Sequence, residues 1–280
     1  MSVSILNNIS SLMAQNQVSM TNTSLQKTLF QLSSGSRINS GADDAAGLAI
    51  ANGLNANIAA LNQSVQNVND GIGQLQTADG ALSQVTSLLN RAVTLSTESA
   101  NGTLSSGQRT AIDAEFTSIK TEIDSIGAST TYNGTSVFTA SASSIFVSDG
   151  SSAAANVTIA TTTGVLSSSS IGTGTPVNLS SDSLTTAAGA TTALTDINSA
   201  ITAVASLRGT IGANINRMSA ATAVANTQVQ NLTSAMDGIT AANIPQVVAN
   251  MSKFQILTQT GIAALSQANQ SQQSVLRLLQ

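Results

Sequence analysis

Apolar residues recur along the first third of the chain at alternating intervals of four and three positions. The unbroken run comprises Leu54, Ile58, Leu61, Val65, Val68, Ile72 and Leu75, and the same steps then lead through Asp79 to Leu82, Thr86, Leu89 and Val93. A mean spacing of about 3.5 residues puts these side chains on one side of an α-helix, as in helices that pack lengthwise. The pattern therefore predicts one long helix with an apolar seam.

The same alternation returns in the second half of the chain. It runs from Leu194 to Ile239 through Ile211 and Ile215, with interruptions at Arg208 and Thr222. A shorter run comprises Ile112, Phe116, Ile119, Ile123 and Ile126, and the C-terminal run comprises Val247, Met251, Phe254, Thr258, Gly261, Leu265, Ala268, Gln272, Val275 and Leu279. The first 35 residues form a weaker amphipathic helix, with Leu6, Ile9, Met13 and Met20 on one stripe and Leu25, Leu29 and Leu32 on a shifted one. Both terminal stripes carry almost no charge, so we expect a partner to cover them.

Helices of this length determine the expected architecture. A helix of about 45 residues is roughly 70 Å long, and the two long seams lie at opposite ends of the sequence. The simplest way to bury both seams brings the N- and C-terminal halves side by side. We therefore expect a mainly α fold, a long antiparallel coiled coil or helical-bundle rod, with a small central region that contains a β-hairpin.

The central region differs in composition from its flanks. Asn133-Gly134 lies between β-forming residues, which is a strong hairpin signal. From about residue 141 to 189 the chain is dominated by Ser, Thr, Ala and Gly, with short apolar alternations in SIFVSD and NVTIAT. This pattern predicts a small β-rich excursion at the far end of the rod. The alternative is a disordered Ser/Thr loop, and its hydroxyls are plausible O-glycan acceptors.

Composition narrows the function. Aromatic residues make up 2% of the chain and charged residues 8%, with a net charge of -4, so the basic clusters that bind nucleic acid are missing. The chain has no histidine and no cysteine, which removes most transition-metal sites and every histidine-dependent triad. We expect no enzyme activity, no cofactor and no metal.

The N-terminal residues MSVSILNNISSLMAQ lack a basic region followed by an apolar run. We therefore expect no secretory signal peptide, and export would need another route. No stretch of 18 apolar residues is present, so no membrane insertion is expected.

The segment RINSGADDAAG, residues 37–47, concentrates rare charges. Ser33-Ser34-Gly35 before it predicts the end of a helix, and Ser40 or Asp43 can cap the next one, with Asp43 and Asp44 in its first turn. A catalytic carboxylate pair is the disfavoured alternative, because no pocket-forming or histidine companions are nearby. Arg37 either pairs with one of these acids, in the same subunit or across an interface, or is a solvated loop residue.

These segments resemble a known family. LSSGSRINSGADDAAGLAIANGL and NDGIGQLQTADGALSQVTSLLNRAVTLSTESANGTLS resemble the N-terminal region of bacterial flagellin, and NMSKFQILTQTGIAALSQANQSQQSVLRLLQ resembles its C-terminal helix. The resemblance spans roughly residues 1–138 and 194–280 and implies a secreted, extracellular subunit of the flagellar filament, a homo-oligomer of many copies. It also implies type III export in an unfolded state and contacts with an export chaperone, a cap and hook-associated proteins.

The family arrangement divides the chain into five parts. Residues 1–40 and 241–280 would form an inner tube, residues 41–138 and 193–240 the next shell, and residues 139–192 a short variable segment that projects outward. The positions expected to carry subunit packing are Leu54, Ile58, Leu61, Val65, Val68, Ile72, Leu75, Ile211, Ile215, Val247, Met251, Phe254, Leu265, Val275 and Leu279. Arg37, Ser40, Asp43 and Asp44 would form the connector between shells.

Some flagellins are recognised by the vertebrate Toll-like flagellin receptor, and the motif for this contact falls on Arg91, Leu95 and Glu115. Asn90 stands where the stimulating pattern usually has glutamine, and Thr94 where it usually has glutamate. Alternatively, Leu95 lies in the core and Arg91 pairs with Glu115 between adjacent helices.

Three other functions fit parts of the pattern. A hook–filament junction protein shares flagellin-like termini and is the nearest alternative. A protease grafted onto a flagellin frame is disfavoured, because the insert has only about 50 residues and the chain has no histidine. A generic coiled-coil adhesin fits the periodicity without the motifs.

Overall fold

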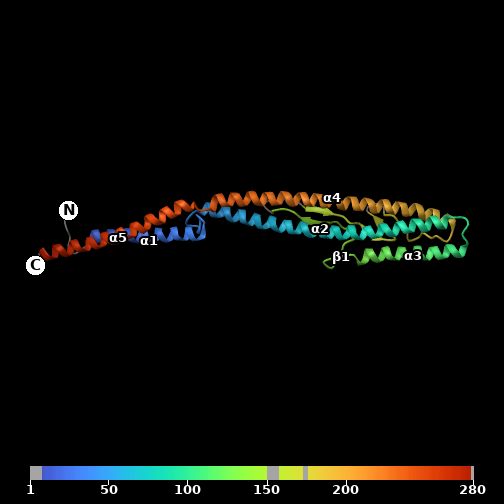
Figure 1. The fold of residues 1–280 in the computed structure, drawn as a ribbon, viewed down its shortest axis with the longest axis horizontal. Helices are drawn as coiled ribbons and strands as arrows, with labels where there is room; N and C mark the ends of the chain where they lie inside the picture. The colour runs from blue at the N-terminus through green and yellow to red at the C-terminus, as the bar shows by residue number, and fades with distance from the viewer. Residues whose placement is uncertain (1–7, 150–157, 173–175, 279–280) are drawn as a thin grey trace. The chain divides into compact units, whose positions relative to one another are not determined.

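The computed structural model describes residues 8–149, 158–172 and 176–278 (Figure 1). Over these residues it contains five α-helices, α1 (Ile9–Ser34), α2 (Ala45–Ala100), α3 (Ser106–Ser129), α4 (Ala187–Thr240) and α5 (Ile244–Leu278). Its antiparallel strand pairs join β1 (Thr131–Tyr132) to β2 (Thr135–Ser136), β3 (Ser143–Phe146) to β4 (Thr158–Thr161), and β5 (Val165–Ser167) to β6 (Ser170–Gly172). The expected mainly α fold with a small β-containing central region is confirmed.

The chain forms two compact units. The first comprises the described residues up to Ala56 and those from Asn231 onward, and the second spans Asn57–Gln230. Each unit therefore joins segments from both halves of the sequence. In the second unit α2 and α4 run antiparallel, because Asp79 pairs with Arg208 while Gly71, earlier in α2, lies near Met218, later in α4.

The core of the second unit follows only one of the two columns in each predicted seam. On α2 and α4 the buried column comprises Leu61, Val68, Leu75, Leu82 and Leu89, and Ile197, Val204, Ile211 and Met218. The companion column predicted through Ile58, Val65, Ile72, Ile201 and Ile215 is only half-buried. Its place in the core is taken by smaller residues one position earlier, Ser64, Gly71, Ala78, Ala92 and Ser99 on α2, and Ala193 and Ala200 on α4. The predicted seam was therefore rotated toward the larger side chains, because small residues carry a weak apolar signal.

The central segment is built into this core. Its apolar side chains Ile145, Ile159, Leu166, Ile171, Leu179 and Leu184 are all buried together with residues of α2, α3 and α4. In Figure 1 part of this segment runs between α2 and α4, and β5 contacts α3. The expected outward excursion at the end of a rod is therefore wrong. Ile145 fills the space beside Gly71 of α2, and Leu166 packs against Gly127 of α3.

Local signals gave the correct element boundaries in two places. The β1–β2 hairpin turns at Asn133 and Gly134, whose φ angles of 49° and 76° belong to the left-handed region that a two-residue hairpin turn requires. Gly35 ends α1 with a φ of 67°, as the Ser-Ser-Gly sequence predicted. The predicted run on α3 is also confirmed, since Phe116, Ile119 and Ile123 are buried.

Candidate functional site: the terminal helix pair and its connector

Helices α1 and α5 lie side by side and antiparallel (Figure 1). The Asn8 amide donates to the carbonyl of Ala268 at 3.2 Å, near one end of the pair. At the other end, the backbone N–H of Ala242 donates to the carbonyl of Gly35 at 2.9 Å. The two ends of the sequence thus form one packed pair.

The C-terminal seam predicted from the sequence is the less exposed side of α5. Val247 is buried, and Met251, Phe254, Gly261 and Leu265 are half-buried. Gly261 marks the tightest approach, because a Cβ built there would lie 2.6 Å from Cγ2 of Val18 on α1. Of the remaining predicted positions, the Val275 side chain and Leu279 lie outside the described residues.

On α1, the side that is shielded from solvent mixes apolar and polar side chains. It comprises Ala14, Val18, Thr21, Leu25, Thr28 and Leu32, spaced alternately by four and three. The hydroxyls of Thr21 and Thr28 donate to the carbonyls of Gln17 and Ser24, both at 2.8 Å, so their burial leaves no donor unpaired.

Most of the large apolar residues of α1 face solvent. Met13 and Phe30 are 67% and 69% exposed, and Ile9, Leu12 and Met20 are exposed as well. At about 100° per residue, this exposed face lies nearly opposite the shielded side. Lys27 is the one charged residue in α1. Such an apolar face on a helix that is already paired is typical of a contact with another molecule.

The connector after α1 is fixed to the end of α4. The backbone N–H of Arg37 donates to the carbonyl of Thr240 at 2.6 Å, and its guanidinium Nη2 donates to the carbonyl of Ile239 at 2.9 Å. These are carbonyls of the last turn of a helix, where a cation interacts favourably with the helix dipole. Within the chain, Arg37 therefore bonds to backbone carbonyls and is neither paired with an aspartate nor a free loop residue, while a pairing across an interface between copies stays a prediction.

The two aspartates of the connector have separate roles, and neither is in the first turn of α2. Asp44 directly precedes the helix, and its carboxylate accepts a hydrogen bond from the N–H of Gly47 at 2.9 Å. It is the capping residue in place of Ser40 or Asp43. The carboxylate of Asp43 instead accepts hydrogen bonds from the backbone N–H groups of Asn39 and Ser40, at 3.1 and 3.0 Å.

Asp43 also links the connector to α1. Its Oδ1 lies 2.6 Å from Nζ of Lys27. The hydrogen bond from Lys27, followed by that from the backbone of Asn39, lowers the pKa of Asp43 from 3.8 to about 2. This is the behaviour of an ionised structural carboxylate, and a general acid would need the opposite shift.

Three charged residues on α3 hold the central segment in place, and the sequence analysis missed them. Asp113 accepts hydrogen bonds from the N–H of Leu184 at 2.6 Å and the hydroxyl of Ser183 at 3.1 Å. Asp124 likewise accepts from the N–H and hydroxyl of Ser168, at 2.6 and 2.8 Å. Lys120 donates to the carbonyl of Asp182 at 2.7 Å. Their spacing of seven and four residues, which places them on one helix face, was the available signal.

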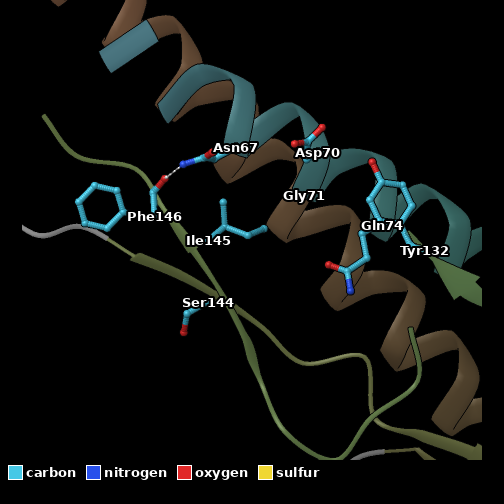
Figure 2. Close-up of a pocket in the computed structure, with 8 residues that line it drawn as sticks. All are labelled: Asn67, Asp70, Gly71, Gln74, Tyr132, Ser144, Ile145 and Phe146. Atoms are coloured by element: carbon cyan, nitrogen blue, oxygen red, sulfur yellow. Dashed lines mark hydrogen bonds between the residues drawn. The ribbon is translucent and has the colours of Figure 1, made fainter. Parts of the chain in front are cut away.

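A hollow on the second unit lies between α2 and β3 (Figure 2). Ile145 projects toward Gly71, where its side chain occupies the space a Cβ would fill, and Asn67 donates to the carbonyl of Phe146 at 3.5 Å. The other lining residues are Asp70, Gln74, Tyr132 and Ser144. With a single carboxylate, this lining offers no acid–base pair. Its visible role is to seat β3 on the helix.

Comparison with known proteins gives the family. The model of the bacterial flagellin N-terminal helical region matches residues 5–143, and that of the flagellin C-terminal helical region matches residues 194–279. Flagellin FlaB1 of Treponema pallidum is 31% identical over 98% of this chain and 99% of its own length. The chain belongs to the bacterial flagellin family. Flagellins are structural proteins of the flagellar filament, and nothing in these matches favours the junction-protein alternative.

Other relatives show how far the similarity extends. The flagellar filament 33 kDa core protein of Treponema phagedenis is 32% identical over 98% of this chain and 99% of its own length. A Salmonella typhimurium flagellin is 43% identical over 86 residues, which are 31% of this chain and 17% of that protein. The chain thus aligns with under a fifth of the Salmonella protein. The crystal structure of Bacillus cereus flagellin is 28% identical, with a TM-score of 0.48 over 61% of this chain and 94% of that one.

The positions that the flagellin motif assigns to receptor contact differ in accessibility. Arg91 on α2 and Glu115 on α3 form a two-bond ion pair at the surface, Nε–Oε1 2.7 Å and Nη2–Oε2 3.0 Å. Each group shifts the other's pKa, so that the Glu115 pKa is lowered and the Arg91 pKa is raised. Leu95 is 1% exposed and lies in the core. Its side chain therefore offers no surface to a receptor in this structure.

Proposed function

We propose that this chain polymerises into the flagellar filament through the exposed apolar face of α1 and the exposed residues of α5. The opposition of two faces on α1 carries the proposal. One face is already shielded against α5, while the other leaves Ile9, Leu12, Met13 and Phe30 in water. Helix α5 adds Ile256 and Ile262, which are also exposed.

Assembly by these faces follows from the hydrophobic effect. Each large apolar side chain that is fully buried contributes about 1.5–3 kcal/mol, before the loss of side-chain and chain freedom is subtracted. Several such residues per copy, repeated on each neighbour, are sufficient for a cooperative polymer. Four of the predicted subunit-packing positions are buried inside the second unit, namely Leu61, Val68, Leu75 and Ile211. They stabilise that unit and are not available for contacts between copies.

The experiment is seeded polymerisation followed by sedimentation and electron microscopy. The full chain should form filaments, whereas a chain that lacks residues 247–280 should stay in the supernatant, because α1 loses the helix against which it packs. Filaments of normal appearance from the truncated chain would overturn the proposal. A control replaces exposed polar residues outside these faces, Gln76 and Gln84 on α2, with alanine and should leave assembly intact.

The assignment to shells and the route out of the cell belong to the same proposal. Residues 1–40 and 241–280 would form the inner tube, and an export chaperone, a cap and hook-associated proteins would be its partners in secretion and assembly. The chain has no cysteine, so no disulfide can trap it during passage in an unfolded state. Among the described residues, no helix is both long and apolar enough to cross a membrane.

If the Toll-like flagellin receptor binds this chain, the contact would involve Arg91 and Glu115, since Leu95 is buried. Arg91 and Glu115 are exposed and accessible, but each already satisfies the other. A receptor that binds Arg91 must replace this pair with an acidic group of its own. A reporter-cell assay of Arg91→Ala tests the contact, and an unchanged response would exclude it.

A further inference from the structure

The methionines of the described chain fall into two groups by accessibility. Met13 and Met20 on α1 are 67% and 59% exposed, whereas Met218 is fully buried and Met236 and Met251 are half-buried. The two exposed residues are seven positions apart, so they lie two turns apart on one face of the helix. That face is the apolar one that points away from α5.

We infer that Met13 and Met20 form a reversible oxidation site that controls assembly, and this inference rests on the proposed function. A peroxide is the oxidant. A thioether sulfur attacks one peroxide oxygen, the O–O bond breaks, and a sulfoxide and water form as sulfur loses two electrons and the peroxide gains them. The chain has no cysteine thiol that could react first.

Oxidation changes the character of this face. A sulfoxide is polar and strongly hydrated, whereas the face it would be buried in is lined by apolar residues such as Ile9 and Leu12, with Asn16 and Gln17 as the neighbouring amides. Burying it against an apolar residue of another copy therefore costs the water that hydrates it. The step is reversible, because a thiol-dependent methionine sulfoxide reductase returns the sulfur to a thioether, forming a disulfide in the reductant and releasing water.

The same geometry predicts when the site is accessible. In the free subunit both sulfurs are open to peroxide. In the filament the apolar face is covered, so the same residues are protected. Oxidation therefore acts on subunits before they are incorporated.

The test treats the full chain with hydrogen peroxide and maps sulfoxides by peptide mass spectrometry. Met13 and Met20 should oxidise before Met218, and the critical concentration for seeded polymerisation should rise by about tenfold per sulfoxide. Treatment with methionine sulfoxide reductases and dithiothreitol should restore it. The variant Met13→Leu/Met20→Leu keeps similar volume and should polymerise equally well before and after peroxide.

The outcomes distinguish failure of the oxidation site from failure of the proposed function. Unchanged assembly of the oxidised chain, or an equal loss in the Met13→Leu/Met20→Leu variant, would overturn the inference while leaving the proposed function standing. Oxidation of both residues at equal rates in filaments and free subunits would overturn the inference together with assembly through this face. Failure of the untreated chain to polymerise would instead refute the proposed function.

Discussion

Arg208 on α4 donates two hydrogen bonds to the carboxylate of Asp79 on α2, with Nε–Oδ1 at 2.8 Å and Nη2–Oδ2 at 3.3 Å. Both residues stand at positions where the apolar alternation of their own helix is interrupted. The two interruptions therefore lie opposite each other in the second unit and pair with each other. A single polar pair within an apolar seam specifies register, because shifting one helix by a turn would separate the two charges.

The energy of this pair is measurable by a double-mutant cycle. The side chains are 38% and 40% exposed, so solvent weakens the attraction. Asp79→Ala and Arg208→Ala should each lower the free energy of unfolding by about 0.5–1 kcal/mol in urea titrations. The double variant should lose clearly less than the sum. Strictly additive losses would show that the two residues do not interact.

Two glycine-to-alanine substitutions should change the free energy of unfolding in opposite directions. A Cβ on Gly127 of α3 would collide with the backbone carbonyl oxygen of Leu166 in β5, so Gly127→Ala should lower the free energy of unfolding by about 1–3 kcal/mol. Gly80 of α2 has open space around it, so Gly80→Ala should raise the free energy by about 0.5–1 kcal/mol through helix propensity.

Thermal unfolding followed by circular dichroism distinguishes the two glycine variants. The melting temperature should fall for Gly127→Ala and rise for Gly80→Ala. If Gly127→Ala were as stable as the natural chain, β5 would not pack against α3 as described.

The connector makes a prediction for acid pH. The pKa of Asp43 is lowered to about 2, so its ionised form favours the folded connector. This contribution is complete above pH 3.8 and is lost as the pH falls through about 2. A carboxyl NMR titration should show the low pKa in the natural chain and a higher one in Lys27→Met. An unchanged pKa in Lys27→Met would contradict the assigned ion pair.

Substituting Leu95 tests whether this residue acts in the core or at the surface. It is enclosed among core residues, so Leu95→Ala should lower the free energy of unfolding by about 2–5 kcal/mol. Arg91→Ala, which removes an exposed ion pair that solvent screens, should lower the free energy of unfolding far less. Urea denaturation of both variants tests this ranking. Equal and small losses would place Leu95 at the surface, where a receptor could bind it directly.

Sequence patterns predicted the features that depend on near neighbours. The Asn133-Gly134 turn and the stop at Gly35 need only a residue that tolerates a positive φ, and both were correct. The described positions of the α5 seam lie on the less exposed side of that helix, because spacing alone identifies one side, while their role in packing between copies stays a prediction. The helix that begins at Ala45 was predicted within a few residues, although its cap is Asp44.

Features that depend on distant segments were missed. Gly71 and Ser64 are core positions because β3 and the residues after it pack there, with the Ser64 hydroxyl donating to the carbonyl of Ser148 at 2.8 Å. Nothing in the local pattern of α2 records that contact. For Arg37 the sequence offered only a nearby acid or solvent as partners, whereas its partners within the chain lie about 200 residues away at the end of α4.

The most direct test of the account asks whether the exposed face of α1 becomes covered in the filament. The chain has no cysteine, so Leu12→Cys introduces a single thiol on that face. Its alkylation rate by iodoacetamide is compared in free subunits, in sedimented filaments, and after the filaments are dissociated again. We predict fast alkylation in the free and dissociated subunits and strong protection in the filament. Equal rates in all three states would contradict assembly through this face.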